Sequence, residues 1–479
     1  MGGSRSDQVV VSPRHDCEAG GTSPLTTVVG LGAIAFMIAF TLLLFLRPIG
    51  APAIAQDTSG RTFVGVATCG GTTCHGRSEA DGPVVRQDEI MLWQDPSSAA
   101  GAHSRAHDVL RDPRSQVIAQ RLGIGEASRA PMCLGCHSTP PGTRASRFQV
   151  SDGVGCESCH GAASGWLSSH YAVGGTHANN VSRGLVALED PRTRAGICLD
   201  CHFGSADDGQ FVTHRIMAAG HPRISFELDL FSTLQAHHQV DDDYRRRKGA
   251  TPSLRMWAIG QAMALDRSLT LFSSPRRGTE GIFPEFYFFD CHSCHRRISD
   301  EADFRPTAVA NPGRPIPSGM PPYNDENMIM LAAAARVVAP GVAGRFEASS
   351  RAFHQAMARD RGAAVAAAGN LRTSARALVD TFATAPMGRP QTFAIIDAIT
   401  SEAISPRFTD YAGSVQAVMA TDTLLSSLVS DGAVTAGAAN RIRGDINGAY
   451  RAVRDPNAYS PGDFRASLGR AAGAIRRLR

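Results

Sequence analysis

The chain has 479 residues, a formal net charge of +4 and 43% hydrophobic residues. This length predicts two or three domains, and the apolar content is sufficient for ordinary hydrophobic cores. The small net charge provides no strongly basic surface, so the composition excludes a typical nucleic-acid-binding protein.

The N-terminal part of the chain has the pattern of a targeting or membrane segment. Residues 1–24 are polar, and residues 26–46 carry no charge over a length that can span a bilayer. Ala53 and Ala55 then match the small-residue pattern of a signal-peptidase site. We predict a cytoplasmic segment at 1–24. Residues 25–55 form either an uncleaved anchor through 26–46 or a signal peptide cleaved near Ala55, and both place the following residues outside the cytoplasm.

Ten of the eleven cysteines lie in five motifs that each end in histidine. Four motifs have the form Cys-x-x-Cys-His, and the first is a longer Cys-x4-Cys-His. The motifs are Cys69, Cys74 and His75; Cys133, Cys136 and His137; Cys156, Cys159 and His160; Cys198, Cys201 and His202; and Cys291, Cys294 and His295. This spacing is typical of covalent c-type haem attachment, in which two thiols form thioethers and the histidine reaches the iron.

Disulfides and zinc sites are the two alternatives for paired cysteines. Neither requires a histidine directly after each pair, and histidine is only 16 of the 479 residues. We therefore predict five covalently attached haem c groups, each with its motif histidine as an iron ligand. In the first motif, Gly70 and Gly71 allow a longer loop to bring both thiols to the ring.

The five motifs define a predicted haem domain at 62–300. They leave roughly 47 residues for each haem, which is too little for a separate protein core around each one. The haem groups must therefore form much of the core and lie close together. Glycine and proline are frequent here, so we expect loops and short helices with few or no strands.

Two longer helices are predicted in this region, over about residues 96–122 and 253–272. The first contains His103 and His107, which are four residues apart and so share a helical face. The acidic and then basic run at 241–248 predicts a solvated loop.

Nine further histidines of this region are candidates for the second iron ligand. The favoured ones are His103 or His107, His170, His177, His214 and His221, and the less favoured ones are His237, His238 and His292. An axial methionine is an alternative that would raise the potential. Met132 and Met217 are the nearest candidates, although core packing explains them more simply.

Several of these motifs together resemble the cytochrome c-554 family of multihaem cytochromes, over roughly residues 62–230. The most specific is the run Gly-Val-Gly-Cys-Glu-Ser-Cys-His-Gly at 153–161. The others are Phe63-Val64-Gly65 before Cys69, Trp93 followed by His103 and His107, Cys-Leu-Gly-Cys-His-Ser-Thr at 133–139, and the later His170.

The resemblance implies a mostly α-helical, haem-packed fold with stacked haem pairs and electron transfer in the periplasm. It implies that His103 or His107, and His170, serve as distal ligands, and that one haem has an open coordination site. This chain departs from the family pattern in its widened first motif, its fifth motif and its long C-terminal extension.

The C-terminal part begins with a proline-rich linker at 301–324. The rest, 325–479, is predicted as an all-α helical bundle without haem, and its last helix has a capping pattern at 460–463. The candidate helices are 325–338, 342–368, 371–384, 391–404, 407–430, 434–454 and 461–478.

The sequence thus predicts a mainly α protein with a multihaem cytochrome c domain followed by a helical bundle. The leading hypothesis is a periplasmic electron carrier between other redox proteins, with no nucleic-acid partner and no catalytic residues. One alternative is a haem enzyme acting on a small nitrogen or sulfur compound at an open haem site. Another is a haem-based sensor or scaffold that signals through the bundle.

Overall fold

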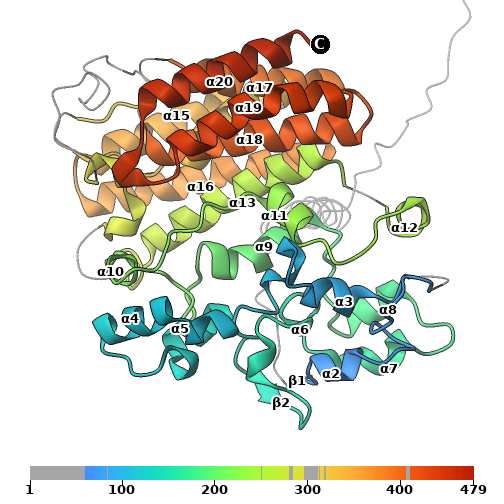
Figure 1. Cartoon of the computed structure of the whole chain (residues 1–479). Coiled ribbons are helices and arrows are strands. Elements are labelled where there is room, and N and C mark those ends of the chain that lie inside the picture. Colours follow the sequence, from blue (N-terminus) through green and yellow to red (C-terminus); the bar gives the residue numbers. More distant parts are fainter. Residues whose placement is uncertain are drawn as a thin grey trace, which may run out of the picture. The chain divides into compact units, whose positions relative to one another are not determined.

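The structure is a computed structural model that describes residues 60–82, 85–249, 251–279, 284–295, 311, 313–317, 320–405 and 410–479. The predicted segment 1–24, the apolar run 26–46 and the cleavage site near Ala55 lie outside these residues. None of the helices in the described ranges is long and apolar enough to cross a membrane. The described fold is mainly helical with very little strand, as the sequence predicts (Figure 1).

The first part of the chain consists of short helices joined by turns and loops. A two-residue strand, β1 (Thr62–Phe63), pairs in parallel with β2 (Thr143–Arg144). The short helices are α2 (Val66–Cys69), α3 (Glu89–Gln94), α4 (Pro113–Leu122), α5 (Pro131–His137), α6 (Glu157–His160), α7 (Leu167–His170), α8 (His177–Ser182), α9 (Pro191–His202), α10 (His214–Ala218), α11 (Leu228–Leu234) and α12 (Asp242–Lys248).

The predicted helix over 96–122 is wrong, since only its last part, α4, is an α-helix. Pro113 starts α4, and the preceding Asp112 is extended, as the residue before a proline usually is. Two 3-10 turns, η1 (Ala99–Ala102) and η2 (Asp108–Arg111), occupy the rest. His103 and His107 therefore do not share one helical face.

The run at 241–248 is helix α12 and not the predicted loop. Asp241 caps it by accepting a hydrogen bond from the N–H of Tyr244 at 2.8 Å. Such an N-cap satisfies a backbone donor that the helix itself leaves unpaired.

The long helix α13 (Ser253–Ser273) confirms the prediction over 253–272. It packs on α9 and α11 from the first part of the chain and on α14, α16 and α18 from the last part. Its buried residues surround most of its circumference, with Trp257 and Leu269 fully buried. A helix that is apolar on nearly all sides is an interior helix, and in Figure 1 α13 lies between the short helices and the C-terminal helices.

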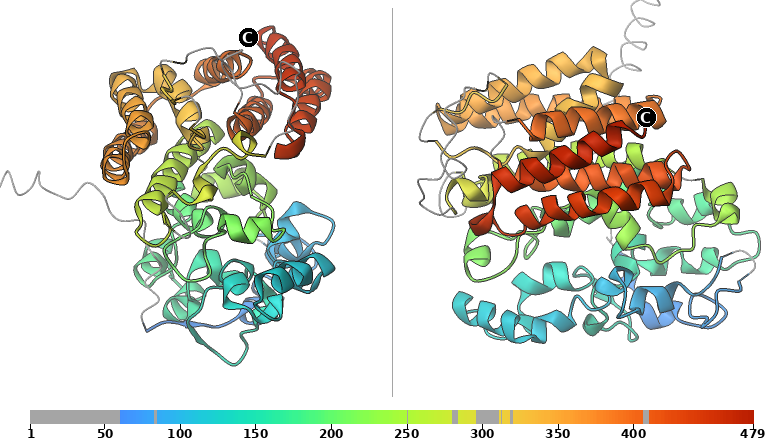
Figure 2. Two further views of the ribbon diagram at one scale, coloured as in Figure 1. Left: turned by 90° about the vertical axis from the view of Figure 1, so that its left-hand side faces the viewer. Right: turned by 45° about the horizontal axis from the view of Figure 1, so that its top comes forward.

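The C-terminal helices run alongside one another, as two further views show (Figure 2). They are α14 (Glu326–Val338), α15 (Pro340–Met357), α16 (Arg361–Thr384), α17 (Arg389–Ala403), α18 (Tyr411–Ser430), α19 (Ala436–Ala452) and α20 (Pro461–Arg476). Ser460 caps α20 by accepting from the N–H of Asp463, and Pro461 is its first residue, as the sequence predicts.

The predicted break between helices at 369–370 is wrong. The chain breaks instead after Met357, and Asp360 caps α16 by accepting from the N–H of Ala363 at 2.8 Å. Gly369 lies inside α16, where a Cβ atom would have met open space. The glycine therefore does not mark a turn, and the aspartate N-cap is the signal that decides the boundary.

One large hydrophobic core joins α13 to the C-terminal helices. It includes Phe288 and Tyr323 from the segment between them and Phe211 from the loop before α10. Two smaller clusters lie in the first part of the chain, one around Leu199 and Phe226 and one around Leu110. Helix α13 precedes the proline-rich linker but shares one hydrophobic core with the helices after the linker. The predicted domain boundaries (haem domain 62–300, linker 301–324, helical domain 325–479) therefore stay predictions.

Candidate functional site

Each motif histidine lies one backbone turn after the first cysteine of its motif. The N–H of His160 donates to the carbonyl oxygen of Cys156 at 2.9 Å, and that of His295 donates to Cys291 at 2.8 Å. The second and fourth motifs lie at the ends of α5 and α9, where the same turn is part of a helix. This frame fits attachment of two thiols to one haem edge with the imidazole directed at its iron.

The longer first motif closes on the same hydrogen bond. The N–H of His75 donates to the carbonyl oxygen of Cys69 at 3.2 Å, so the two additional residues are accommodated within the turn. Gly76 permits this closure, because a Cβ atom there would lie 2.1 Å from the carbonyl oxygen of Gly70. The first motif therefore offers the backbone frame of the four shorter ones.

The cysteines adopt neither of the alternative arrangements. The ten motif cysteines form no disulfide. A structural zinc site gathers four ligands, but among the described residues the one group of three or more possible metal ligands is His160, His237 and His238. It contains no cysteine, so the cysteine pairs fit covalent attachment better than zinc binding.

Each motif histidine faces at least one other histidine. The ring centroids are 6.1–6.3 Å apart in His75 with His170, His137 with His221, His160 with His237 and with His238, His202 with His103, and His295 with His214. A metal–imidazole nitrogen bond is about 2 Å long, so two imidazoles on opposite sides of one metal ion have centroids about 6 Å apart. All six separations therefore fit two axial ligands of an iron, with His237 and His238 as alternatives at the third motif.

Several of these imidazoles are held through Nδ1. Backbone carbonyl oxygens accept from Nδ1 of His137 (Ala106, 2.6 Å) and of His221 (Pro222, 2.8 Å). The carboxylate of Glu89 accepts from Nδ1 of His75 at 3.0 Å. Because a carbonyl or carboxylate oxygen can only accept, the proton is on Nδ1 and the lone pair of Nε2 is available to a metal.

Burial also keeps several of these imidazoles neutral. It lowers the pKa of His160 to about 3, with His238 and His237 nearby, and that of His202 to about 4. The hydrogen bond to Glu89 instead raises the pKa of His75. A metal binds only the neutral imidazole, so the buried histidines are in the binding form at neutral pH.

Three candidate histidines have other partners. His177 is exposed, and its Nε2 lies 2.8 Å from a carboxylate oxygen of Glu189. His107 is buried with Nε2 3.3 Å from the carbonyl oxygen of Ser128. The Nδ1 atom of His292 donates to the carbonyl oxygen of Pro456 at 2.9 Å.

His237 and His238 are among the less favoured candidates that the sequence predicts for the second iron ligand, but they are the histidines that face His160. His170 follows the third motif by ten residues but faces His75 of the first. The one usable signal was the adjacent pair of histidines itself, because two imidazoles in a row are rare in a chain with so few of them.

Glu157 explains why the third motif is the most specific part of the sequence. Its buried carboxylate accepts from the backbone N–H groups of Val64 at 2.9 Å, Gly65 at 2.8 Å and Ala163 at 2.7 Å. The first two precede α2, which ends at Cys69, the first cysteine of the first motif. One carboxylate thus joins the first motif to the third.

The same run contacts the second motif and one of the facing histidines. The hydroxyl of Ser158 donates to Oγ1 of Thr139 at 3.0 Å, and the N–H of Thr139 donates to Gly153 at 2.9 Å. The N–H of Val154 donates to the carbonyl oxygen of His103 at 3.0 Å. Gly153 is required here, because its φ is 69° and a Cβ atom would lie 2.6 Å from that oxygen.

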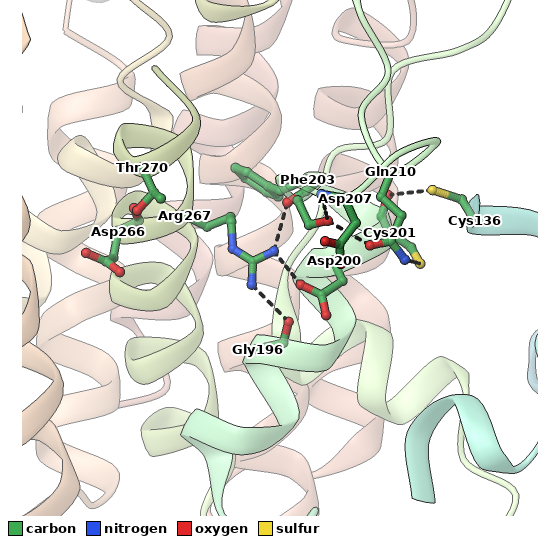
Figure 3. A network of polar contacts seen from close by, with 12 residues as sticks. Cys136, Gly196, Asp200, Cys201, Phe203, Asp207, Gln210, Asp266, Arg267 and Thr270 are labelled. Atoms are coloured by element: carbon green, nitrogen blue, oxygen red, sulfur yellow. Dashed lines mark hydrogen bonds and ion pairs between the residues drawn. The ribbon is translucent and has the colours of Figure 1, made fainter. Parts of the chain in front are cut away.

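Gln210 joins the second motif to the fourth. Its side-chain amide donates to the carbonyl oxygen of Gly135 at 3.1 Å. It also lies 3.9 Å from the sulfur of Cys201, and Figure 3 shows these two residues side by side. A small pocket lies at the fourth motif, lined among others by Cys201, His202 and His221. The pocket thus lies between the fourth motif and the histidine that faces the second.

Arg267 anchors the fourth motif to α13. Figure 3 shows its guanidinium pointing from α13 to Asp200, with an N–O distance of 2.6 Å. It also donates to the carbonyl oxygens of Gly204 at 2.8 Å and Gly196 at 3.3 Å. Burial raises the pKa of Asp200, and Arg267 opposes that rise.

The fifth motif packs directly on the C-terminal helices. A carboxylate oxygen of the buried Asp290 accepts from the N–H of Ala412, near the start of α18, at 2.9 Å. His292, inside the motif, contacts the loop between α19 and α20 through Pro456. The bundle therefore positions the last motif.

Cysteine pairs on a shared backbone frame, each with a histidine that faces another across about 6 Å, define a c-type cytochrome with covalently bound haem. Residues 68–161 match the family model of cytochrome c554 and c-prime, which confirms the resemblance to the cytochrome c-554 family. This segment contains the first three motifs and the hydrogen-bonded run around Glu157. No curated protein and no solved structure matches the chain.

Proposed function

We propose that the protein is a five-haem cytochrome that transfers electrons between redox partners in the periplasm. The observation that supports this best is that each of the five motif histidines faces another histidine at 6.1–6.3 Å. When bound, haem c supplies a reversible one-electron iron couple. The residues that would hold the irons are the five pairs, with His170, His221, His238, His103 and His214 as the second ligands.

Two histidines at each iron leave no coordination position for a substrate. This disfavours the alternative of a haem enzyme, which needs at least one open site. It also departs from the open site that the family resemblance implies.

The contacts between motifs support a continuous route for electrons. Glu157 joins the first motif to the third, and Gln210 joins the second to the fourth. The third and fourth are also neighbours, because Cys159 and Cys198 lie close enough to interact electrostatically. Arg223, which lines the pocket beside the fourth motif, donates to the sulfur of Cys291 in the fifth at 3.8 Å.

The N-terminal sequence supports export, either with residues 26–46 as an anchor or with cleavage near Ala55. Sequencing the N-terminus of the exported protein distinguishes the two, since cleavage makes Gln56 the first residue.

A pyridine haemochrome assay, combined with absorption and EPR spectra of the oxidised protein, tests the proposal. We expect five haem groups per chain, low-spin signals alone and no binding of carbon monoxide or nitric oxide. Four haem groups would exclude attachment at the first motif. A high-spin fraction that reacts with nitric oxide or hydroxylamine would favour the enzyme.

A further inference from the structure

Side-chain contacts join the segment after the first motif to the segment that carries His237 and His238. Arg86 forms an ion pair with Asp241, and the side-chain amide of Gln239 donates to Asp88 at 3.0 Å. Glu89 then faces His238, with 3.7 Å between a carboxylate oxygen and Nδ1. Three successive contacts thus hold the two segments in one register.

Glu89 lies between two of the proposed iron ligands, His75 and His238. One of its oxygens accepts from Nδ1 of His75 at 3.0 Å, and the other is the one directed at Nδ1 of His238. The side chain is buried, with 8% of its surface exposed. Both histidines favour the charged form of Glu89 and hold its pKa low, against the effect of burial.

His237 and His238 compete for the position opposite His160, since both lie at almost the same distance from it. Their Nδ1 atoms have different neighbours. The Nδ1 atom of His237 lies 2.9 Å from the side-chain amide nitrogen of Gln235 and 3.2 Å from the backbone carbonyl oxygen of the same residue, a neutral donor and a neutral acceptor that together fix neither tautomer. The carboxylate beside His238 favours the proton on Nδ1 and leaves Nε2 free to bind a metal.

We propose that Glu89 is a positioning residue shared by two haem sites, which holds His75 at the first and selects His238 over His237 as the ligand opposite His160 at the third. The inference rests on the proposed five-haem function. A carboxylate beside the Nδ1–H of an iron-bound imidazole, hydrogen-bonded as at His75 or within ion-pair distance as at His238, makes that imidazole a stronger electron donor, which stabilises the oxidised iron and lowers its potential. One side chain thus lowers the potentials of two neighbouring haem groups together.

The test is a redox titration of the full-length holoprotein, followed by absorption and EPR, for wild type and Glu89→Gln. Glutamine can still accept from His75 but carries no charge. We expect two of the five components to shift to more positive potential and three to keep theirs. The matched control is Asp88→Asn, which removes the neighbouring buried carboxylate without touching a histidine, and we expect a smaller shift. Equal shifts in both variants, a shift of all five components or no shift in Glu89→Gln would overturn the proposal.

A second pair of variants decides the ligand even if Glu89→Gln does not fold. Removing the ligand, as in His238→Ala, changes the low-spin EPR signal of one haem, whereas His237→Ala leaves it unchanged. The reverse result would overturn the selection of His238. A wild-type protein with fewer than five low-spin haem groups would instead contradict the proposed function, so the two failures are distinguishable.

Discussion

The residues that decide the chemistry of this protein are imidazoles whose Nδ1 atoms are already engaged. At His137 and His221 both Nδ1–H groups donate to backbone carbonyl oxygens, which leaves the two Nε2 atoms for a metal between the rings. Backbone acceptors cannot be removed by substitution, so these two orientations are built into the loops that carry the histidines.

Replacement of His221 by alanine should open one of the five proposed iron sites. We expect a high-spin EPR signal from one haem per chain and binding of one carbon monoxide per chain. The matched control is His177→Ala, since His177 is exposed and paired with Glu189. A fully low-spin His221→Ala protein, or a high-spin signal in the control, would show that the ring distances do not report ligation.

The relative tilt of paired imidazole planes gives a second prediction. The planes of His75 and His170 are 17° apart, whereas those of His137 and His221 are 89° apart. Nearly parallel planes split the two iron orbitals that overlap with the ring π-systems, and perpendicular planes leave them nearly degenerate. The EPR spectrum should therefore contain a rhombic low-spin signal, weakened in His170→Ala, and a signal with one very large g value, weakened in His221→Ala but kept in part, because the planes of His160 and His238 are also 84° apart. A single type of low-spin signal would contradict this expectation.

The five motif histidines are predicted as iron ligands from the sequence because each is part of a local covalent pattern. The facing histidines could not be assigned in this way, because their partners are fixed by tertiary contacts. His170 lies close in sequence to the third motif, but its backbone is carried by α7 to the first. His237 and His238 face His160 across more than 70 residues, a distance over which spacing carries no information.

At the scale of elements, the short helices are tied together by side chains that bond to backbone groups. Glu157 is the strongest example, with three backbone donors on one buried carboxylate. Such bonds replace the apolar contacts that longer helices would provide, because short helices have too little surface for a hydrophobic core of their own.

Glu157→Ala should therefore destabilise the holoprotein strongly. It leaves three backbone N–H groups without their acceptor, at a cost of about 1–3 kcal/mol for each buried donor, so we expect a loss of about 3 kcal/mol or more. Unfolding in guanidinium chloride, followed by haem absorbance and circular dichroism, measures it. The control Glu126→Ala, at an exposed side chain paired only with Arg129, should stay within about 0.5 kcal/mol of wild type. A loss of only about 0.5 kcal/mol in Glu157→Ala would contradict the proposal that this carboxylate holds the short helices together.

Arg267→Met should weaken the joint between α9 and α13. The variant leaves Asp200 and two backbone carbonyl groups without their donor, and because Asp200 is partly exposed we expect a loss of about 1–3 kcal/mol. Arg276→Met is the matched control, since Arg276 pairs with Asp208 at the same 2.6 Å but on the surface. Equal losses of unfolding free energy in denaturant titrations would show that the pair of Arg267 and Asp200 stabilises the fold no more than the surface pair does.

Element boundaries were predictable where one residue dictates the backbone. Pro461 and the capping serine before it mark the start of α20 in both the sequence and the structure. The helix expected over 96–122 failed because Pro113 starts a new helix there and does not continue an old one. A continuous helix was expected there, with His103 and His107 on one face, but Pro113 is the first residue of a separate helix.

At the scale of the whole molecule, the C-terminal helices and the haem-bearing part share polar joints as well as a core. The amide of Gln416 on α18 donates to the carbonyl oxygen of Phe226 at 3.0 Å. Thr423, two turns further along α18, donates to the carboxylate of Glu227 at 3.2 Å. The composition predicted that a helical bundle follows the haem motifs, but not that its fifth helix, α18, contacts the segment before α11.

Glu227 makes this joint sensitive to pH. Burial raises its pKa to about 8, and Asp229 adds to the rise, although the N–H groups of Asp229 and Leu230 and the hydroxyl of Thr423 favour the charged form. In the unfolded chain the carboxyl has its ordinary pKa near 4.5. Between these two values the folded protein holds a proton that the unfolded chain has released, so stability falls as the pH rises.

Glu227→Gln should remove this part of the pH dependence, because glutamine stays neutral throughout. We expect the melting temperature of the wild type to fall between about pH 4.5 and 8, and that of the variant to fall less. Thermal unfolding followed by circular dichroism measures both curves. Glu402→Gln, at an exposed position of α17, should keep the wild-type slope. Parallel curves for wild type and Glu227→Gln would mean that the carboxyl is already ionised in the fold, held by its three donors. A flatter curve for Glu227→Gln than for wild type would show that the contact between Glu227 and Thr423 of α18 is sensitive to pH.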